Sequence, residues 1–116
     1  MSSDMAKFRE NRTKMNERIF AENFTPINRF FKLDTSAYEA GALGSKTKEL
    51  MGLSISTAMR CDDCIRDHLD RAISEGATRA EIVETLNIAL IVGGSIVIPH
   101  LRRAFEAMDE LLDKRD

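Results

Sequence analysis

Apolar residues recur along this chain at intervals of three and four positions, and no stretch keeps the strict alternation typical of a half-buried strand. This spacing predicts an all-α protein, because residues three and four positions apart share one face of a helix. The chain has 116 residues, of which 43% are hydrophobic and 31% charged, enough for one modest core. We therefore expect a single-domain bundle of about six helices over residues 1–116.

Charge and hydropathy exclude several classes of partner. The formal net charge is −2, and Lys and Arg are interleaved with Asp and Glu, so we expect no nucleic-acid partner. The N-terminus lacks the apolar core of a secretory signal. The longest apolar run, residues 88–99, contains two glycines and is far shorter than the roughly 20 residues that span a bilayer. We expect a soluble, cytoplasmic protein with no membrane partner.

Two helices are expected in the first third of the chain. The first covers about residues 4–21, and its apolar side would be formed by Met5, Phe8, Met15, Ile19 and Phe20. The second begins at Thr25 and Pro26, because threonine can cap free N–H groups and proline is tolerated in a first turn. Gly41 and Gly44 interrupt the pattern before the third helix.

The third helix, over about residues 46–59 with Ser45 as its cap, contains one residue that needs a partner. Its many apolar residues predict that it is largely buried; they are Leu50, Met51, Leu53, Ile55 and Ala58. Glu49 would be costly on such a helix without a partner. Gly52 and Ser56 follow on the same face, where short side chains would let another element pack over Glu49.

Three further helices are expected after residue 60. Cys61 opens the fourth helix, which ends at Gly76. Thr78 and Glu81 form a capping box for the fifth, whose buried stripe would be Ile82, Leu86, Ala89 and Gly93. The last helix begins within residues 95–98, and its apolar side would be Leu101, Phe105, Met108, Leu111 and Leu112.

The fourth helix carries the candidate chemistry. Cys61, Cys64 and His68 stand at positions i, i+3 and i+7, so they should form one cluster. These are the only two cysteines, and a cytosolic pair at this spacing indicates chemistry rather than a disulfide framework. His68 can exchange a proton with the Cys64 thiol, and the first-turn N–H groups favour the thiolate. Asp62 and Asp63 oppose this, because negative charge raises a thiol pKa, so the net effect stays open.

Four stretches carry a combined pattern: residues 41–50, the run Cys61-Asp-Asp-Cys-Ile-Arg-Asp-His68, residues 75–83, and Gly93-Gly94. Its specific core is a helix-borne Glu followed by Cys-x-x-Cys-x-x-x-His. Over roughly residues 30–105 the chain resembles the carboxymuconolactone decarboxylase superfamily, in its alkylhydroperoxidase D-like branch. The resemblance implies an antioxidant peroxidase, an all-helical homotrimer or homohexamer whose cysteine pair cycles between dithiol and disulfide while reducing hydroperoxides.

By motif position, the resemblance implies that Cys64 is the thiolate that attacks peroxide, Cys61 the resolving thiol, and Glu49 with His68 a proton relay. The chemistry requires such a set, because the departing oxygen needs a proton and the sulfenic acid must meet a second thiol. Peroxidase members of the family carry a histidine where this chain has Asp63, which leaves open whether Asp63 weakens the activity. With no cofactor motif present, we expect an external thiol or dithiol as reductant.

Other interpretations of the same residues remain. Cys61, Cys64, His68 and His100 could form a zinc site, although two thiols on one helix suit zinc poorly, or the cysteines could be inert core residues. His100 otherwise reads as structural or surface-exposed, and we expect no metal. The functional alternatives are a decarboxylase-type lyase, against which the cysteine pair argues, a non-enzymatic redox sensor or assembly subunit, and a general reductase of lipoyl, thioredoxin-like or small disulfides.

Overall fold

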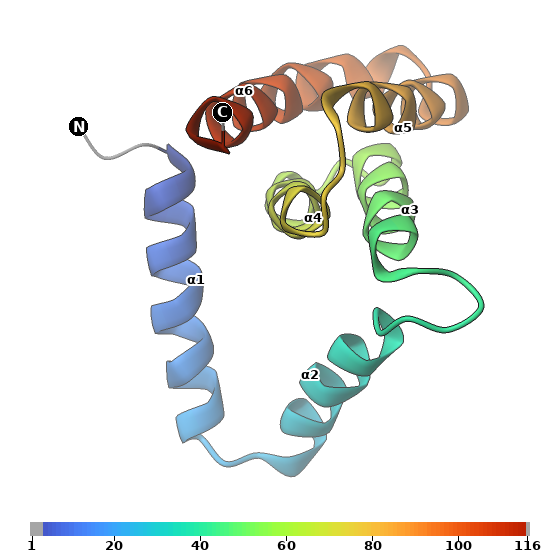
Figure 1. Ribbon diagram of the computed structural model, residues 1–116. Helices are drawn as coiled ribbons and strands as arrows, with labels where there is room; N and C mark the ends of the chain where they lie inside the picture. Colours follow the sequence, from blue (N-terminus) through green and yellow to red (C-terminus); the bar gives the residue numbers. More distant parts are fainter. Residues whose placement is uncertain (1–3, 116) are drawn as a thin grey trace. The chain divides into compact units, whose positions relative to one another are not determined.

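The computed structural model describes residues 4–115, and within that range the chain forms six α-helices, one short 3₁₀-helix and no strand (Figure 1). The elements are α1 (Asp4–Ala21), α2 (Thr25–Ala37), α3 (Ser45–Ala58), α4 (Asp62–Ser74), α5 (Arg79–Gly93), the 3₁₀-helix η1 (Ser95–Val97) and α6 (Ile98–Arg115). The predicted all-α fold is confirmed.

The helices belong to two compact units, one that ends at Ala40 and contains α1 and α2, and one that begins at Gly41 and contains α3 to α6. The single-domain organisation stays a prediction. In the first unit the rings of Phe20 and Phe31 meet edge to face, with centroids 4.8 Å apart. The expected apolar side of α1 is wrong in extent, because only Met5 is buried along that helix.

Two helix starts differ from the expected caps. Phe24 and Gly44 occupy the N-cap positions of α2 and α3, and neither helix has a side-chain hydrogen bond at its cap. Thr25 and Ser45 are already the first helical residues, so their hydroxyls stand one position too late to cap. Pro26 lies in the first turn of α2, as predicted.

The second unit has an apolar core that holds α4 in place. α3 packs against α4 and α5, and α4 also packs against α6. The fully buried large residues of these four helices are Leu53, Ile65, Leu69, Ile82, Leu86, Met108 and Leu112. Ile82 and Leu86 confirm the predicted stripe of α5. The predicted apolar side of α6 is correct for its second half, but Phe105 is exposed.

α3 is buried along one stripe only, which corrects the expectation of a largely buried helix. The buried residues are Glu49, Gly52, Leu53, Ser56 and Thr57. Met51 and Ile55 are exposed, with 57% of Ile55 accessible to solvent. The apolar residues of α3 point to several sides of the helix, whereas α4 and α5 cover the side that carries small and polar residues.

α5 begins at the capping box that the sequence predicted, and Gly93 leaves space for a neighbouring side chain at its other end. The Thr78 hydroxyl accepts a hydrogen bond from the Glu81 amide at 3.2 Å, and Glu81 accepts one from the Thr78 amide at 2.9 Å. This amide and the Lys46 ammonium hold the pKa of Glu81 below its ordinary value of 4.5. Near the other end, a side chain at Gly93 would collide with the Val97 side chain, whereas its contact with the backbone of Ala58 would be an ordinary one, so the glycine makes room for Val97.

Candidate active site

A tight turn at the end of α3 places Cys61 at the start of α4. The amide of Cys61 donates to the carbonyl of Ser56 and the amide of Arg60 donates to the carbonyl of Thr57, each at 3.0 Å. These two bonds form a Schellman motif. Arg60 has a φ of 61°, in the left-handed region where an L-residue costs roughly 1–2 kcal/mol. The backbone is therefore strained directly before the first cysteine.

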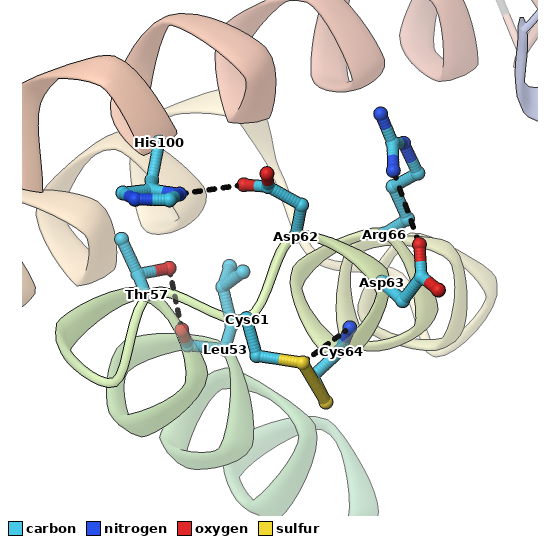
Figure 2. Close-up of a disulfide and its surroundings, with 8 residues drawn as sticks. All are labelled: Leu53, Thr57, Cys61, Asp62, Asp63, Cys64, Arg66 and His100. Atoms are coloured by element: carbon cyan, nitrogen blue, oxygen red, sulfur yellow. Dashed lines mark hydrogen bonds and ion pairs between the residues drawn. A yellow bond between two sulfur atoms is a disulfide. The ribbon is translucent and has the colours of Figure 1, made fainter.

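Cys61 and Cys64 are joined by a disulfide, with their Cα atoms 5.3 Å apart (Figure 2). Cys61 is the N-cap of α4, one residue before the helix itself, and its Sγ accepts a hydrogen bond from the Cys64 amide at 3.3 Å. Cys61 is partly exposed and Cys64 is exposed. The pair thus lies at the positive end of the helix dipole, within reach of small reagents.

Glu49 meets the partner that its burial required. Its Oε1 lies 2.9 Å from His68 Nδ1, and the two side chains are 6% and 12% exposed. The contact joins α3 to α4 across 19 residues of sequence. His68 also stands one helical turn after Cys64 on α4, so the imidazole that contacts the buried carboxylate shares a helix face with the redox pair.

Gly52 makes room for this contact. A Cβ atom at Gly52 would lie 2.6 to 2.9 Å from three ring atoms of His68, closer than packed side chains approach. The sequence predicted that a short residue here would let a neighbour pack over Glu49, and the neighbour that fills the space beside Gly52 is the His68 ring. Ser56, the other short residue of that face, is also buried.

A second carboxylate–histidine contact, which the sequence did not predict, is formed by Asp62, the residue after Cys61, on the side of the helix start that faces His100 (Figure 2). Asp62 Oδ1 is 2.8 Å from His100 Nδ1, and Asp62 Oδ2 accepts a hydrogen bond from Arg103 at 3.0 Å. The side chains of Asp62 and His100 are 28% and 19% exposed. Asp63, in contrast, is 81% exposed and forms an ion pair of 3.3 Å with Arg66 of its own helix. His100 and Arg103, at i and i+3 on α6, were the available signal, but nothing local indicated their partner.

The donor set of the zinc interpretation is not brought together. His68 is bonded to Glu49, and His100 is bonded to Asp62. Within residues 4–115 no group of three or more His, Cys, Asp or Glu side chains has the placement of a metal site. The same part of the chain contains no helix that is both long and apolar enough to cross a membrane.

The profile of the carboxymuconolactone decarboxylase family matches residues 27–107. A crystal structure of a Thermotoga maritima protein has a TM-score of 0.91 and 54% identity, and the match covers 94% of this chain and 96% of that one. A second structure of the Thermotoga protein describes it as a member of this family with a suggested involvement in the antioxidative response. A family protein from Legionella pneumophila has a TM-score of 0.86 and 30% identity, over 95% of this chain and 98% of that one.

Two curated relatives match at lower identity. An uncharacterized protein of the cox locus of Paracoccus denitrificans is 29% identical over 82 residues, which are 71% of this chain and 74% of that protein. The alkyl hydroperoxide reductase AhpD of Corynebacterium kroppenstedtii is 39% identical over 46 residues, which are 40% of this chain and 26% of the reductase. The similarity to this reductase therefore covers only about a quarter of its length.

Proposed function

The chain belongs to the carboxymuconolactone decarboxylase family, in its alkylhydroperoxidase D-like branch, and on that premise we propose that it is a thiol-dependent oxidoreductase that reduces hydroperoxides. The observation that carries the proposal is the Cys61–Cys64 disulfide at the exposed start of α4, one helical turn before His68, whose imidazole contacts the buried Glu49. The redox pair and the histidine of the candidate proton relay thus lie one turn apart on α4, and the glutamate of the relay comes from α3.

The first step is attack by Cys64. Its thiolate attacks the terminal oxygen of a hydroperoxide ROOH. A sulfur–oxygen bond forms and the oxygen–oxygen bond breaks, which leaves a sulfenic acid on Cys64 and an alkoxide that takes up a proton and departs as ROH. Exposure of Cys64 supports its role as the attacking residue, because the peroxide must reach the sulfur in line.

The second step closes the disulfide. The thiol of Cys61 attacks the Cys64 sulfenic acid, the sulfur–sulfur bond forms and water departs. An external dithiol then reduces the disulfide by exchange and is itself oxidised to a disulfide. The Cα separation of 5.3 Å is in the usual range for bonded cysteines, so the backbone at the start of α4 accommodates the disulfide. We propose the cytoplasm as the location, because reductants there regenerate the dithiol.

Glu49 and His68 would supply the proton that the alkoxide requires. Their 2.9 Å contact orients the imidazole from Nδ1, which leaves the ring's other nitrogen to face away from the carboxylate. A carboxylate that is 6% exposed interacts strongly with its partner, because little water screens it. This pair would therefore act as the relay, directly or through water.

We also propose that the chain works as a homotrimer or homohexamer. Large apolar residues are exposed in both units, among them Phe30, Leu33, Ile55, Ile91 and Val92. Such residues favour association when they are contiguous. Light scattering coupled to size-exclusion chromatography would measure the assembly, and a monomer at micromolar concentration would contradict it.

The deciding experiment is titration of the reduced protein with cumene hydroperoxide, with the state of each cysteine mapped by mass spectrometry. We expect one disulfide per peroxide consumed in the wild type. Cys61→Ser should accumulate a sulfenic acid on Cys64, whereas Cys64→Ser should consume no peroxide. Glu49→Gln should slow oxidation at neutral pH by about 10- to 100-fold, and the exposed control Glu75→Gln should leave it unchanged.

Thiols that stay reduced under excess peroxide would contradict the peroxidase proposal. If a lipoyl or small-molecule disulfide then oxidised the pair, the general disulfide reductase would be favoured, since the same dithiol can exchange with such partners. If neither reagent was turned over but the disulfide still formed slowly in air, a non-enzymatic sensor would remain.

A further inference from the structure

Asp62 is the residue next to Cys61, and two side chains of α6 contact its carboxylate. His100 and Arg103 approach the two oxygens separately, at 2.8 and 3.0 Å, from 38 and 41 residues away in sequence. The proposed relay of Glu49 and His68 uses none of these groups. A three-residue contact directly beside the redox pair therefore has no role in the peroxide chemistry described above.

The direction of the Asp62 side chain is informative. In Figure 2 its carboxylate points toward His100, while the disulfide lies on the opposite side of the start of α4. The helix dipole alone favours Asp62 anywhere in the first turn of α4, so it does not determine this direction. The contacts from α6 do, because they engage both oxygens of the carboxylate.

The charge of Asp62 matters to a reduced cysteine pair. A carboxylate close to a thiol disfavours the thiolate form, and a cation bonded to that carboxylate offsets this effect. The charged or titratable partners of Asp62, Asp63 and His68 on α4 are Glu49 from α3, Arg66 from α4 itself, and His100 and Arg103 from α6. Among them, Arg103 and His100 are the groups bonded to the carboxylate adjacent to Cys61.

We propose that His100 and Arg103 are positioning residues of the redox pair: both hold the Asp62 carboxylate on the α6 side of α4, and Arg103 offsets its charge, so that Cys64 ionises more readily. The inference rests on the proposed use of Cys64 as a thiolate. Asp63 and Arg66 provide an internal contrast, because that ion pair is formed within one helix by an aspartate that is 81% exposed. Water already screens Asp63, so its partner should matter little.

The test measures thiolate formation without peroxide. Reduced protein is alkylated with iodoacetamide between about pH 5 and 10, and the rate at each cysteine is followed by mass spectrometry. Arg103→Gln should raise the pKa of Cys64 and slow its alkylation at pH 7 by about three- to tenfold. The matched control Arg66→Gln should change it less than about twofold. Arg103→Lys, which keeps the charge, should stay close to the wild type.

The double variant separates charge from structure. If Arg103 acts through the charge of Asp62, Asp62→Asn combined with Arg103→Gln should restore the wild-type alkylation profile. A double variant as slow as Arg103→Gln, or an Arg103→Gln profile equal to that of the wild type, would overturn the proposal. Loss of helical circular dichroism in Arg103→Gln would overturn it as well, because the half-exposed contact would then serve folding.

Because alkylation requires no peroxide and no electron donor, the two proposals fail separately. If the wild type does not react with hydroperoxide but the Arg103 variants show the expected alkylation profiles, the peroxidase function is contradicted and this inference stands. The reverse result would leave a working peroxidase whose thiolate does not depend on α6.

Discussion

The two sides of α4 carry contacts of the same chemistry in different surroundings. On the α3 side, Glu49 and His68 are 2.9 Å apart and nearly buried; on the α6 side, Asp62 and His100 are 2.8 Å apart, partly exposed and joined by Arg103. Distance does not distinguish them. Burial does, because an unpaired polar group costs much more inside the protein than at its surface.

The two sides also differ in what they require of their neighbours. The α3 side needs a residue without a Cβ at position 52, since the His68 ring fills that space. On the α6 side, the contact with Asp62 depends on no such close packing, and the Arg103 side chain has about half of its surface exposed to water. The α3 contact should therefore tolerate few substitutions, and the α6 contact many.

The strongest way to break the α3 side is Gly52→Val. The added side chain would overlap the His68 ring and push it away from Glu49. We expect a loss of about 2–3 kcal/mol in the free energy of unfolding, measured by urea denaturation followed by circular dichroism. Gly41→Val is the control, because the nearest atom to its Cβ would be Lys48 Nζ at 3.8 Å, an ordinary contact. Equal midpoints for the two variants would contradict the packing role of Gly52.

Truncating the two carboxylates compares the sides directly. Glu49→Ala should cost about 2 kcal/mol, because it removes the carboxylate that His68 contacts in a nearly buried site. Asp62→Ala should cost about 1 kcal/mol or less, since solvent can replace its contacts. The same urea titration measures both variants. If Asp62→Ala were the more costly, burial would not be the property that separates the two sides.

The turn that aligns both sides can be relaxed at Arg60. Arg60→Gly removes the left-handed strain but adds entropy to the unfolded chain, so we expect a gain of up to about 1 kcal/mol. The equivalent turn after α4 already has a glycine, Gly76, with a φ of 92°. Gly76→Ala should therefore lose about 1 kcal/mol. A destabilised Arg60→Gly protein would indicate that the Arg60 side chain makes a contact worth more than the strain.

Salt should produce the smallest effect and act on one side only. Raising NaCl to about 0.5 M should weaken the coupling between Asp62 and Arg103 by a few tenths of a kcal/mol, because water and ions screen a half-exposed pair. The coupling between Glu49 and His68 should stay constant. Double-mutant cycles at low and high salt measure both quantities. A coupling that falls equally on both sides would contradict the difference in screening.

Local signals predicted part of this molecule well. The Thr78–Glu81 capping box and the left-handed Gly76 depend on neighbours within a few residues, and both were predicted from the sequence. The close approach at Gly52 was predicted too, because a residue without a side chain, one turn from a buried acid, leaves space for the partner that the acid requires. Short-range interactions decide each of these features, so a single sequence contains them.

Interactions between distant segments were harder to predict. The partner of Asp62 stands 38 residues away, and no local pattern connects the two. The burial of α3 was overestimated, because the sequence of an apolar helix does not reveal which of its sides the neighbouring helices will cover. Ile55, for example, is exposed to solvent. For the candidate site, the sequence indicated the candidate residues and their one-turn spacings, and their role stays a prediction, while the contacts between helices required the structure.

The sulfur atom of Cys61 closes the first turn of α4 as well as the disulfide. A change at this position therefore alters helix capping and redox chemistry together. Serine is among the best N-cap residues, whereas alanine removes the acceptor and costs about 1 kcal/mol at such positions. Cys61→Ser thus keeps the end of the helix intact while it removes the thiol, and lost turnover in that variant reports on chemistry. The same loss in Cys61→Ala would mix chemistry with a frayed helix.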